Sequence, residues 1–321
     1  MAIPIKLKKR WDVYPSLQDV LAATQNLSVS PFGLTEEGLQ DFRGIKLEYS
    51  HDKYYYDYFE LIITGMQNCD FSGSKWLNFL LVSKEHKNPS TIENCVFNEA
   101  FFDKSLAGKM IFKNCSFDDC TIKDHTFYGI LQSCSFKGIR KKNTKLFFNC
   151  DLIKDCLFEG KMRKINFWGS PLEDCVFKGT LYDCSFDGLE MRSEKWKKGY
   201  VTPEEVDNRF DRIDFSQAEV MMSSFADCYL DRVKPSPNNC LVHCTDAFFD
   251  KLCELVEAKA SDDEKIMRYA KSFYRPHPRR PYAFAHPKDF TNPKEPESFV
   301  FAQRLYDLVC EAAEATNYRI K

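Results

Sequence analysis

The sequence predicts a mainly β solenoid, a fold in which the chain winds into short coils that stack on one another. Three observations lead to this fold class. Over about half of the 321 residues, a large apolar side chain recurs at every fifth position, a small one, often Cys, precedes it by two, and Gly often follows it by two. Helices repeat near 3.6 residues and strands near 2, so a period of five fits neither structure alone. The clearest register runs through Phe97, Phe102, Ala107, Phe112, Phe117, Ile122 and Phe127.

The period of five is typical of a coil with straight sides, because each pentad supplies one side and one corner. Roughly 20 residues then complete a coil, and successive coils stack at about 4.8 Å, the spacing of paired strands. We expect the register to slip at 127–131, 152–158 and 182–186. Two segments, 83–94 and 192–209, fit no register. They are predicted to be loops, which often carry function on a rigid scaffold.

Four of the pentads, CSFKG, CLFEG, CVFKG and CSFDG, resemble the repeat of the pentapeptide-repeat family, which is loosely A(D/N)LXX. The resemblance extends from near residue 66 to near residue 232. It implies a right-handed, four-sided parallel β-helix. The periodicity alone predicts a solenoid without fixing its hand.

The regions on either side of the repeat differ in kind. Residues 1–65 are predicted to form an N-terminal cap region, 66–244 the β-helix with its two loops, and 245–321 a helical C-terminal extension. In the first region we expect a short helix at 16–25 and, in the aromatic run KYYYDYFELIIT, a strand or cap over the first coil. The alternative for this run is a binding surface made by its tyrosines.

The C-terminal extension has a helical period. One face of its first helix carries Phe248, Leu252, Leu255 and Val256. Ser261 and Glu264 are spaced as in a capping box that would begin a second helix. A Pro-rich connector follows, and a last helix is expected at 297–316. A solenoid needs its last coil covered, so we interpret these helices as a cap. By resemblance to the family, dimerisation through C-terminal helices is the alternative.

The composition narrows the class of protein. Hydrophobic residues make up 44% of the chain and include 28 Phe, which excludes a disordered chain. A net charge of −2 excludes a global field that would attract nucleic acid. Ten of the 14 Cys lie in the repeat two positions before a Phe, Leu or Ile, so we interpret them as small apolar fillers with reduced thiols. Without a secretion leader or an apolar run of membrane length, we expect a cytoplasmic protein that does not enter membranes.

The sequence contains none of the P-loop, HExxH or GxSxG motifs. His125 falls at an inward small position of a pentad and is predicted to be a core residue. The run CLVHC offers Cys240, His243 and Cys244, but it lacks the second pair of ligands that a structural zinc site needs. We therefore predict a protein that is not an enzyme and holds no cofactor or metal.

Surface charge gives the candidate interaction residues, because residues one coil apart become neighbours on one face of a solenoid. A basic stripe is predicted from Arg140, Lys141 and Lys142, followed by Lys161, Arg163 and Lys164, with Lys195, Trp196, Lys197 and Lys198 at a loop tip. An acidic stripe is predicted from Asp151, Asp155 and Glu159, followed by Glu173 and Asp174. The alternative is a mixed, solvated surface over which register slips scatter these residues, with Trp196 folded onto the coil.

Three functions remain open at this point. The first is a protein-binding module that docks a partner through its faces, loops and terminal helices. The second is implied by resemblance: some pentapeptide-repeat proteins bind type II topoisomerases, mimic DNA and protect cells from gyrase poisons. Almost equal numbers of acidic and basic residues in the repeat weigh against such mimicry. The third is nucleic-acid binding through the basic stripe and the 195–198 loop, which salt-dependent retention on DNA would reveal.

Overall fold

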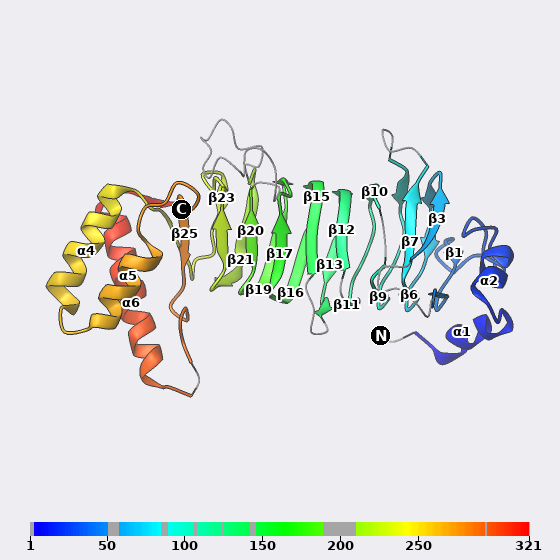
Figure 1. The fold of residues 1–321 in the computed structure, drawn as a ribbon, viewed down its shortest axis with the longest axis horizontal. Coiled ribbons are helices and arrows are strands. Elements are labelled where there is room, and N and C mark those ends of the chain that lie inside the picture. The colour runs from blue at the N-terminus through cyan, green and yellow to red at the C-terminus, as the bar shows by residue number, and fades with distance from the viewer. Residues whose placement is uncertain are drawn as a thin grey trace. The chain divides into compact units, whose positions relative to one another are not determined.

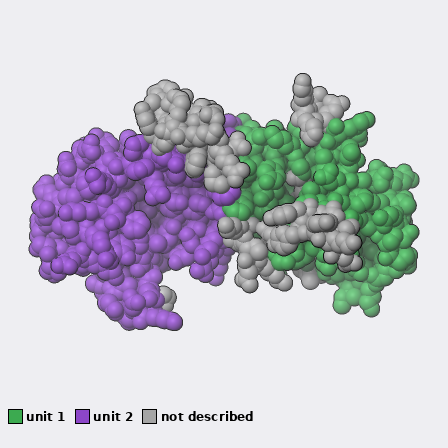
Figure 2. Space-filling model, viewed as in Figure 1, with its two compact units in different colours: residues 1–160 green, residues 161–321 purple. Residues whose placement is uncertain are grey.

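The computed structural model describes residues 3–50, 58–84, 89–105, 108–123, 125–141, 146–188, 210–292 and 294–320 (Figure 1). The chain forms two compact units, residues 1–160 and residues 161–321 (Figure 2). The predicted loop 192–209 lies outside the described residues, as do the first tyrosines of the aromatic run. Among the described residues, no helix is long and apolar enough to cross a membrane.

The first unit begins with short helices that are held to the turn at residues 41–43. These elements are α1 (Ile5–Lys9), the 3-10 helix η1 (Arg10–Val13) and α2 (Leu17–Ala23), which confirms the helix predicted at 16–25. Arg10 donates two hydrogen bonds to the carboxylate of Asp41, at 2.5 and 2.8 Å. The indole of buried Trp11 donates to the carbonyl of Arg43 at 2.9 Å. Together these bonds fix the N-terminal segment against the start of the coils.

Short strands make up the rest of the first unit, and the last of them runs past its end at residue 160. They are β1 (Gln40–Asp41), β2 (Lys46–Glu48), β3 (Phe59–Ile63), β4 (Met66–Gln67), β5 (Cys69–Asp70), β6 (Lys75–Leu77), β7 (Phe79–Ser83), β8 (Thr91–Glu93), β9 (Phe101–Asp103), β10 (Met110–Lys113), β11 (Thr121–Lys123), β12 (His125–Gln132), β13 (Ser135–Lys137), β14 (Arg140–Lys141), β15 (Leu146–Lys154) and β16 (Leu157–Arg163). Paired strands are thus present before residue 66, and β8 lies inside the segment predicted as the loop 83–94.

Each strand pairs in parallel with one about a coil away in sequence, as the period of five predicts. In one sheet of the first unit the order is β14, β11, β9, β6, β2, and in another it is β15, β12, β10, β8, β4. The pairing of β12 with β15 slips between Gly129 and Ile130, inside the predicted slip at 127–131. The observed fold is therefore mainly β with parallel sheets.

A column of stacked phenylalanine rings fills the first unit. Phe97 lies parallel to Phe117 with 4.9 Å between ring centroids, and Phe117 lies parallel to Phe136 at 5.0 Å. The same column continues to Phe71 on one side and to Phe158 on the other. These rings are 0–1% exposed, so the residues that define the period of five are the core.

Left-handed backbone precedes many of the inward-facing cysteines. Asn94, Asn114 and Asp119 have φ values of 54°, 53° and 56°, and each directly precedes a buried Cys. Asn and Asp tolerate this region better than most residues with a Cβ. At the bends of the coils, Asn and Asp therefore adopt left-handed backbone, as do several of the glycines in the sequence pattern.

The second unit continues with strands of the same kind. They are β17 (Ile165–Trp168), β18 (Leu172–Glu173), β19 (Val176–Tyr182), β20 (Ser185–Asp187), β21 (Ile213–Met221), β22 (Ser224–Ala226) and β23 (Val233–Lys234). Within the unit, β17 pairs with β20 and β20 with β22, all in parallel. Phe167, Phe186 and Phe225 stack with 4.7 Å between successive ring centroids, so the core is again a column of rings.

Helices and a small antiparallel sheet end the second unit. They are β24 (Cys240–His243), α4 (Asp246–Ala260), α5 (Glu264–Phe273), β25 (Tyr282–Ala285), α6 (Glu297–Ala315) and β26 (Arg319–Ile320). The α4 and α6 helices confirm the first and last helices predicted for this region. The expected capping box of Ser261 and Glu264 is wrong: Asp263 is the N-cap of α5 and accepts a hydrogen bond from the Ile266 amide at 3.0 Å.

The last coil of the second unit is covered by the Pro-rich connector, including its strand β25. Phe284 of β25 packs on Phe225 and Phe215, with ring centroids 4.9 and 5.6 Å away. Arg279 donates to the fully buried carboxylate of Asp227 at 2.5 and 2.8 Å. A charge-assisted pair of this kind ties the connector to the end of the coils.

Candidate interaction surface

Charged side chains on successive coils of the first unit face one another in pairs of opposite sign. Lys113 lies 2.9 Å from Glu93, and Lys123 lies 2.7 Å from Asp103. In the second unit, Arg212 donates to both carboxylate oxygens of the Asp174 side chain, at 2.5 and 2.8 Å. The lysines and arginine are roughly half exposed, so each pair contributes little to stability. These ion pairs instead determine the charge of the surface, because they place acidic and basic side chains next to each other on successive coils.

The predicted basic residues are placed as follows. Arg140 begins β14 with its guanidinium 3.8 Å from Asp119. Lys161 is exposed, the guanidinium of Arg163 lies 5.1 Å from the ring centroid of Tyr182, and Lys164 is 3.6 Å from Asp183. Lys142 and the 195–198 loop tip lie outside the described residues. Arg140 and Lys141 belong to the first unit and Lys161, Arg163 and Lys164 to the second, so the single stripe stays a prediction.

The predicted acidic residues divide in the same way. In the first unit, Asp151 lies 3.8 Å from Lys109, Asp155 is exposed and Glu159 is half-buried. In the second unit, Glu173 and Asp174 are half-buried, and Asp174 holds Arg212. The acidic stripe therefore also stays a prediction, although two of its carboxylates already have cationic neighbours.

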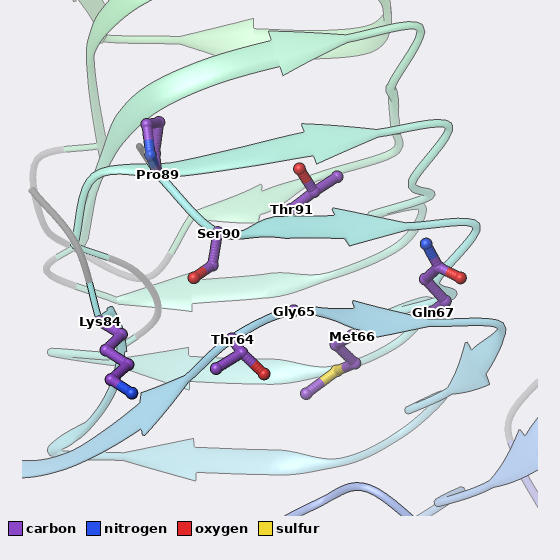
Figure 3. Close-up of a pocket in the computed structure, with 8 residues that line it drawn as sticks. All are labelled: Thr64, Gly65, Met66, Gln67, Lys84, Pro89, Ser90 and Thr91. Carbon is purple, nitrogen blue, oxygen red and sulfur yellow. The ribbon is translucent and has the colours of Figure 1, made fainter. Parts of the chain in front are cut away.

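A surface hollow of about 600 Å³ lies where the predicted loop 83–94 leaves the coils (Figure 3). It is lined from strands β4 and β8, from the residues that precede each of them and from Lys84 after β7. These residues are Thr64, Gly65, Met66, Gln67, Lys84, Pro89, Ser90 and Thr91. The Ser83 and Ser90 hydroxyls are 3.0 Å apart, and the Ser90 hydroxyl donates to the carbonyl of Ile63 at 2.8 Å. These bonds close the base of the loop. The hollow offers hydroxyl, amide and ammonium groups to a polar partner.

His125 is a core residue, as predicted. It is 6% exposed, and its ring meets that of Phe127 edge to face at 4.7 Å. No hydrogen-bond partner for its Nε2 atom lies within the described part of the chain. Burial lowers the pKa of His125 to about 3. The imidazole is therefore neutral in the folded protein at ordinary pH.

Neutral, buried His125 predicts a pH dependence of stability. The unfolded chain takes up a proton on this imidazole as pH falls below 6.5, while the folded chain does not until its lower pKa is reached. Between these values, each pH unit of acidification lowers the free energy of unfolding by about 1.4 kcal/mol. Urea unfolding of wild type and His125→Leu at pH 8, 6, 5 and 4 measures this slope.

The difference between the two proteins isolates the histidine, because every other titrating group is common to both. At pH 8 the imidazole is neutral in both states, so the difference there reports packing alone and serves as the internal control. We expect the wild type to lose stability relative to the variant below pH 6. A difference that does not vary with pH would contradict the burial of a neutral imidazole.

The cysteines are buried or half-buried, and all are free thiols. Asp70, Val96, Ser116 and Ser135 pair in register, so the cysteines that precede them, Cys69, Cys95, Cys115 and Cys134, lie one above another. Cys240 and Cys244 of the CLVHC run are buried, and burial raises the pKa of Cys244 to about 12. A protonated thiol suits a packing role, since metal ligands are thiolates. The described residues include no group of three or more metal-ligating side chains.

Comparison with known proteins found no matching family model and no matching curated protein. Among solved structures, the chain is similar to QnrB1, a plasmid-mediated fluoroquinolone resistance protein, with 14% identity over 61% of this chain and 88% of that one, at a TM-score of 0.30. It is also similar to HetL, a pentapeptide repeat protein involved in heterocyst differentiation regulation in the cyanobacterium Nostoc, with 10% identity over 56% of this chain and 87% of that one, at a TM-score of 0.22.

At such low TM-scores, the fold rests on features of the chain itself. Pentads such as CSFKG supply the inward Cys and Phe, and their strands pair in parallel with strands about one coil away. The phenylalanines of successive coils stack in a buried column. By its repeat and by the way that repeat folds, this chain resembles the pentapeptide-repeat proteins.

Proposed function

We propose that this protein is a non-enzymatic binding protein that docks a protein partner on the outward faces of its coils. The observation that carries the proposal is the stacked phenylalanine column. Because the rings hold successive coils in register, the outward side chains of each coil are displayed at a fixed spacing. A preordered surface loses little conformational entropy when a partner binds.

We further propose that the coils wind as a right-handed, four-sided β-helix. The order of strands in the first unit supports four sides, since β5, β6, β7 and β8 follow one another in the chain and each pairs in a different sheet. The hand follows from the resemblance to the family. A right-handed winding also agrees with the hand of nearly all parallel β connections.

The basic residues Arg140, Lys161, Arg163 and Lys164 are the proposed docking residues. All four side chains are exposed. Their charges are therefore accessible to the carboxylates of another protein. Such contacts set association rate and specificity more than affinity.

The test is affinity capture from host lysate, with and without nuclease, of wild type and of a variant with all four residues changed to Gln. A matched control changes Lys251 and Lys259 of α4 to Gln. We expect a partner that survives nuclease, is retained by the control and is lost by the four-residue variant. If all three proteins recover the partner equally, the four residues are not the docking residues. If none of them recovers a specific partner, the proposed protein-binding function is wrong.

A type II topoisomerase is the alternative partner, suggested by the C-x-F pentads that resemble those of the topoisomerase-binding subgroup. DNA mimicry needs a sustained acidic face, and the pairing of Asp151 and Asp174 with cations weighs against one. Supercoiling assays with purified gyrase and topoisomerase IV test this alternative. If the protein protects supercoiling from a gyrase poison, a type II topoisomerase becomes the favoured partner. Salt-dependent retention on DNA, lost on nuclease treatment, would favour nucleic-acid binding instead.

Homodimerisation through the C-terminal helices is a second proposed contact. Phe299 and Val300 on α6 are 44% and 72% exposed, although most of the helix is packed against its own unit. Light scattering of wild type and of Val300→Glu measures the mass directly. A monomer at all concentrations would leave these helices with a capping role alone.

A further inference from the structure

The second unit contains a small cavity of about 160 Å³ between the last coil, the end of α5 and the connector. Half of the residues that line it are aromatic, among them Phe225 from β22, Phe284 from β25 and Phe273 from the last turn of α5. Phe273 is 54% exposed and contacts Phe290, so one wall of the cavity reaches the surface. A partly open aromatic cavity of this kind is typical of a ligand site.

Tyr274 lines the cavity with a hydroxyl that has no hydrogen-bond partner in the part of the chain that the structure describes. The residue is only 4% exposed. This hydroxyl is not among the fully buried, unpartnered polar atoms of the described residues. It is therefore open to pair with water or with a polar group of a ligand.

Asp289 supplies a fixed acceptor in the same cavity. One carboxylate oxygen accepts the Met222 amide at 2.8 Å, and the other accepts the His286 amide at 2.9 Å. Each oxygen can still accept one more hydrogen bond. Burial raises the pKa of Asp289 to about 6, and the nearby charge of this carboxylate adds to the burial that raises the pKa of Tyr274.

We propose that this cavity binds a single aromatic ring that carries a hydroxyl group, as in a phenol. An apolar cavity of about 150 Å³ holds one benzene ring, so the volume matches one ring. The ring packs among Phe225, Phe273 and Phe284, and its hydroxyl donates to Asp289 and accepts from Tyr274. The ring is either a free small phenol or the side chain of a tyrosine.

The positive charge of Arg280 favours a tyrosine flanked by acidic residues, and this refinement rests on the proposed protein-binding function. Arg280 belongs to a stretch, residues 265–288, that has seven Lys or Arg and no Asp or Glu. Arg279 and Lys288 of this stretch have carboxylate partners. Arg280, which lines the cavity, is exposed and has no ion pair among the described residues.

In the experiment, the full chain is titrated with p-cresol and, separately, with toluene, and NMR measures binding of each probe. The two probes share size and ring but differ in the hydroxyl, so we expect p-cresol to bind more tightly by about tenfold or more, since each net hydrogen bond contributes up to about tenfold. Tyr274→Phe should reduce this ratio without abolishing it, since it removes one hydrogen-bonding group and leaves the Asp289 acceptor in place. The matched control Tyr269→Phe, outside the cavity wall, should leave the ratio unchanged.

A second variant keeps the result independent of any folding defect. Ala283→Leu fills the cavity and should abolish binding of both probes, while the circular dichroism and melting temperature of each variant confirm that it folds. Equal affinity for p-cresol and toluene, binding that survives Ala283→Leu, or no saturable binding of either probe would each overturn the proposal.

A final arm separates the two sources of the ring. A five-residue peptide with tyrosine between glutamates is compared with the same peptide carrying phenylalanine. Tighter binding of the tyrosine peptide than of p-cresol supports a tyrosine of a partner, and the reverse supports a free phenol. None of these probes requires the partner of the proposed docking residues, so failure of that function and failure of this site are told apart.

Discussion

Phe117→Ala should lower the free energy of unfolding by about 3–5 kcal/mol, the usual loss for a buried aromatic ring replaced by a methyl group. Phe117 is 0% exposed and lies in the middle of the ring column, between Phe97 and Phe136. Its ring also meets Phe112 and Phe127 edge to face at 5.7 and 5.5 Å. The variant loses contacts with two coils at once, and the paired strands around it leave little room to collapse.

Urea unfolding followed by tryptophan fluorescence measures this loss, because buried Trp76 packs on Phe97 in the same column. The matched control is Phe299→Ala on α6, where the ring is 44% exposed. We expect the control to lose less than about 1 kcal/mol. Similar losses for both variants would show that the column is not the source of stability that its packing indicates.

Gly129→Ala should lower the free energy of unfolding by about 3 kcal/mol or more, through backbone strain and a direct clash. Gly129 has a φ of +84°. A Cβ at this position would lie 2.2 Å from the carbonyl oxygen of Met110, on the strand paired beside it. Since the obstacle is backbone, β10 and β12 must separate locally to admit the methyl group.

Gly38→Ala separates the two causes. Gly38 has a similar φ of +79°, but nothing lies within 4 Å of the position of a Cβ. We expect this control to lose about 1 kcal/mol from backbone strain alone. The same urea titration measures both variants, and an equal loss would mean that the strands around Gly129 move apart without penalty.

The period of five was sufficient to predict the core and the parallel pairing, because one rule of spacing sets both. The period also begins earlier in the chain than residue 66, where we predicted it to start. Phe42 and Leu47 are five residues apart, Gly44 follows Phe42 by two, and Phe42 stacks on Phe71 at 4.9 Å. A register begun at Phe42 would have found β1 and β2.

Local competition explains the error at the start of α5. Ser261 and Glu264 have the spacing of a capping box, but Asp263 stands between them and is also a strong N-cap residue. Since α4 continues to Ala260, Ser261 is used at its C-cap and the next helix begins later. Spacing rules do not decide between two good caps that overlap.

The residues of the candidate sites differ in how far the sequence reveals them. His125 was predictable as a core residue because it occupies an inward position of a pentad. The cavity of the second unit was not, since Tyr274, Asp289 and Met222 come from three separate segments that only the fold brings together. The opposite charges that meet on successive coils also depend on the register of the strands, which places Lys113 beside Glu93.

The ring column also limits how the length of such a chain can change during evolution. Adding or removing a whole coil returns every later residue to the face it occupied and leaves a ring above each ring. Adding a single pentad would turn every later side chain by one side of the coil. Phe117 and Phe136 stack on each other and lie one coil apart. Duplicating or deleting the complete coil between them would therefore preserve the stack, whereas duplicating or deleting part of that coil would break it.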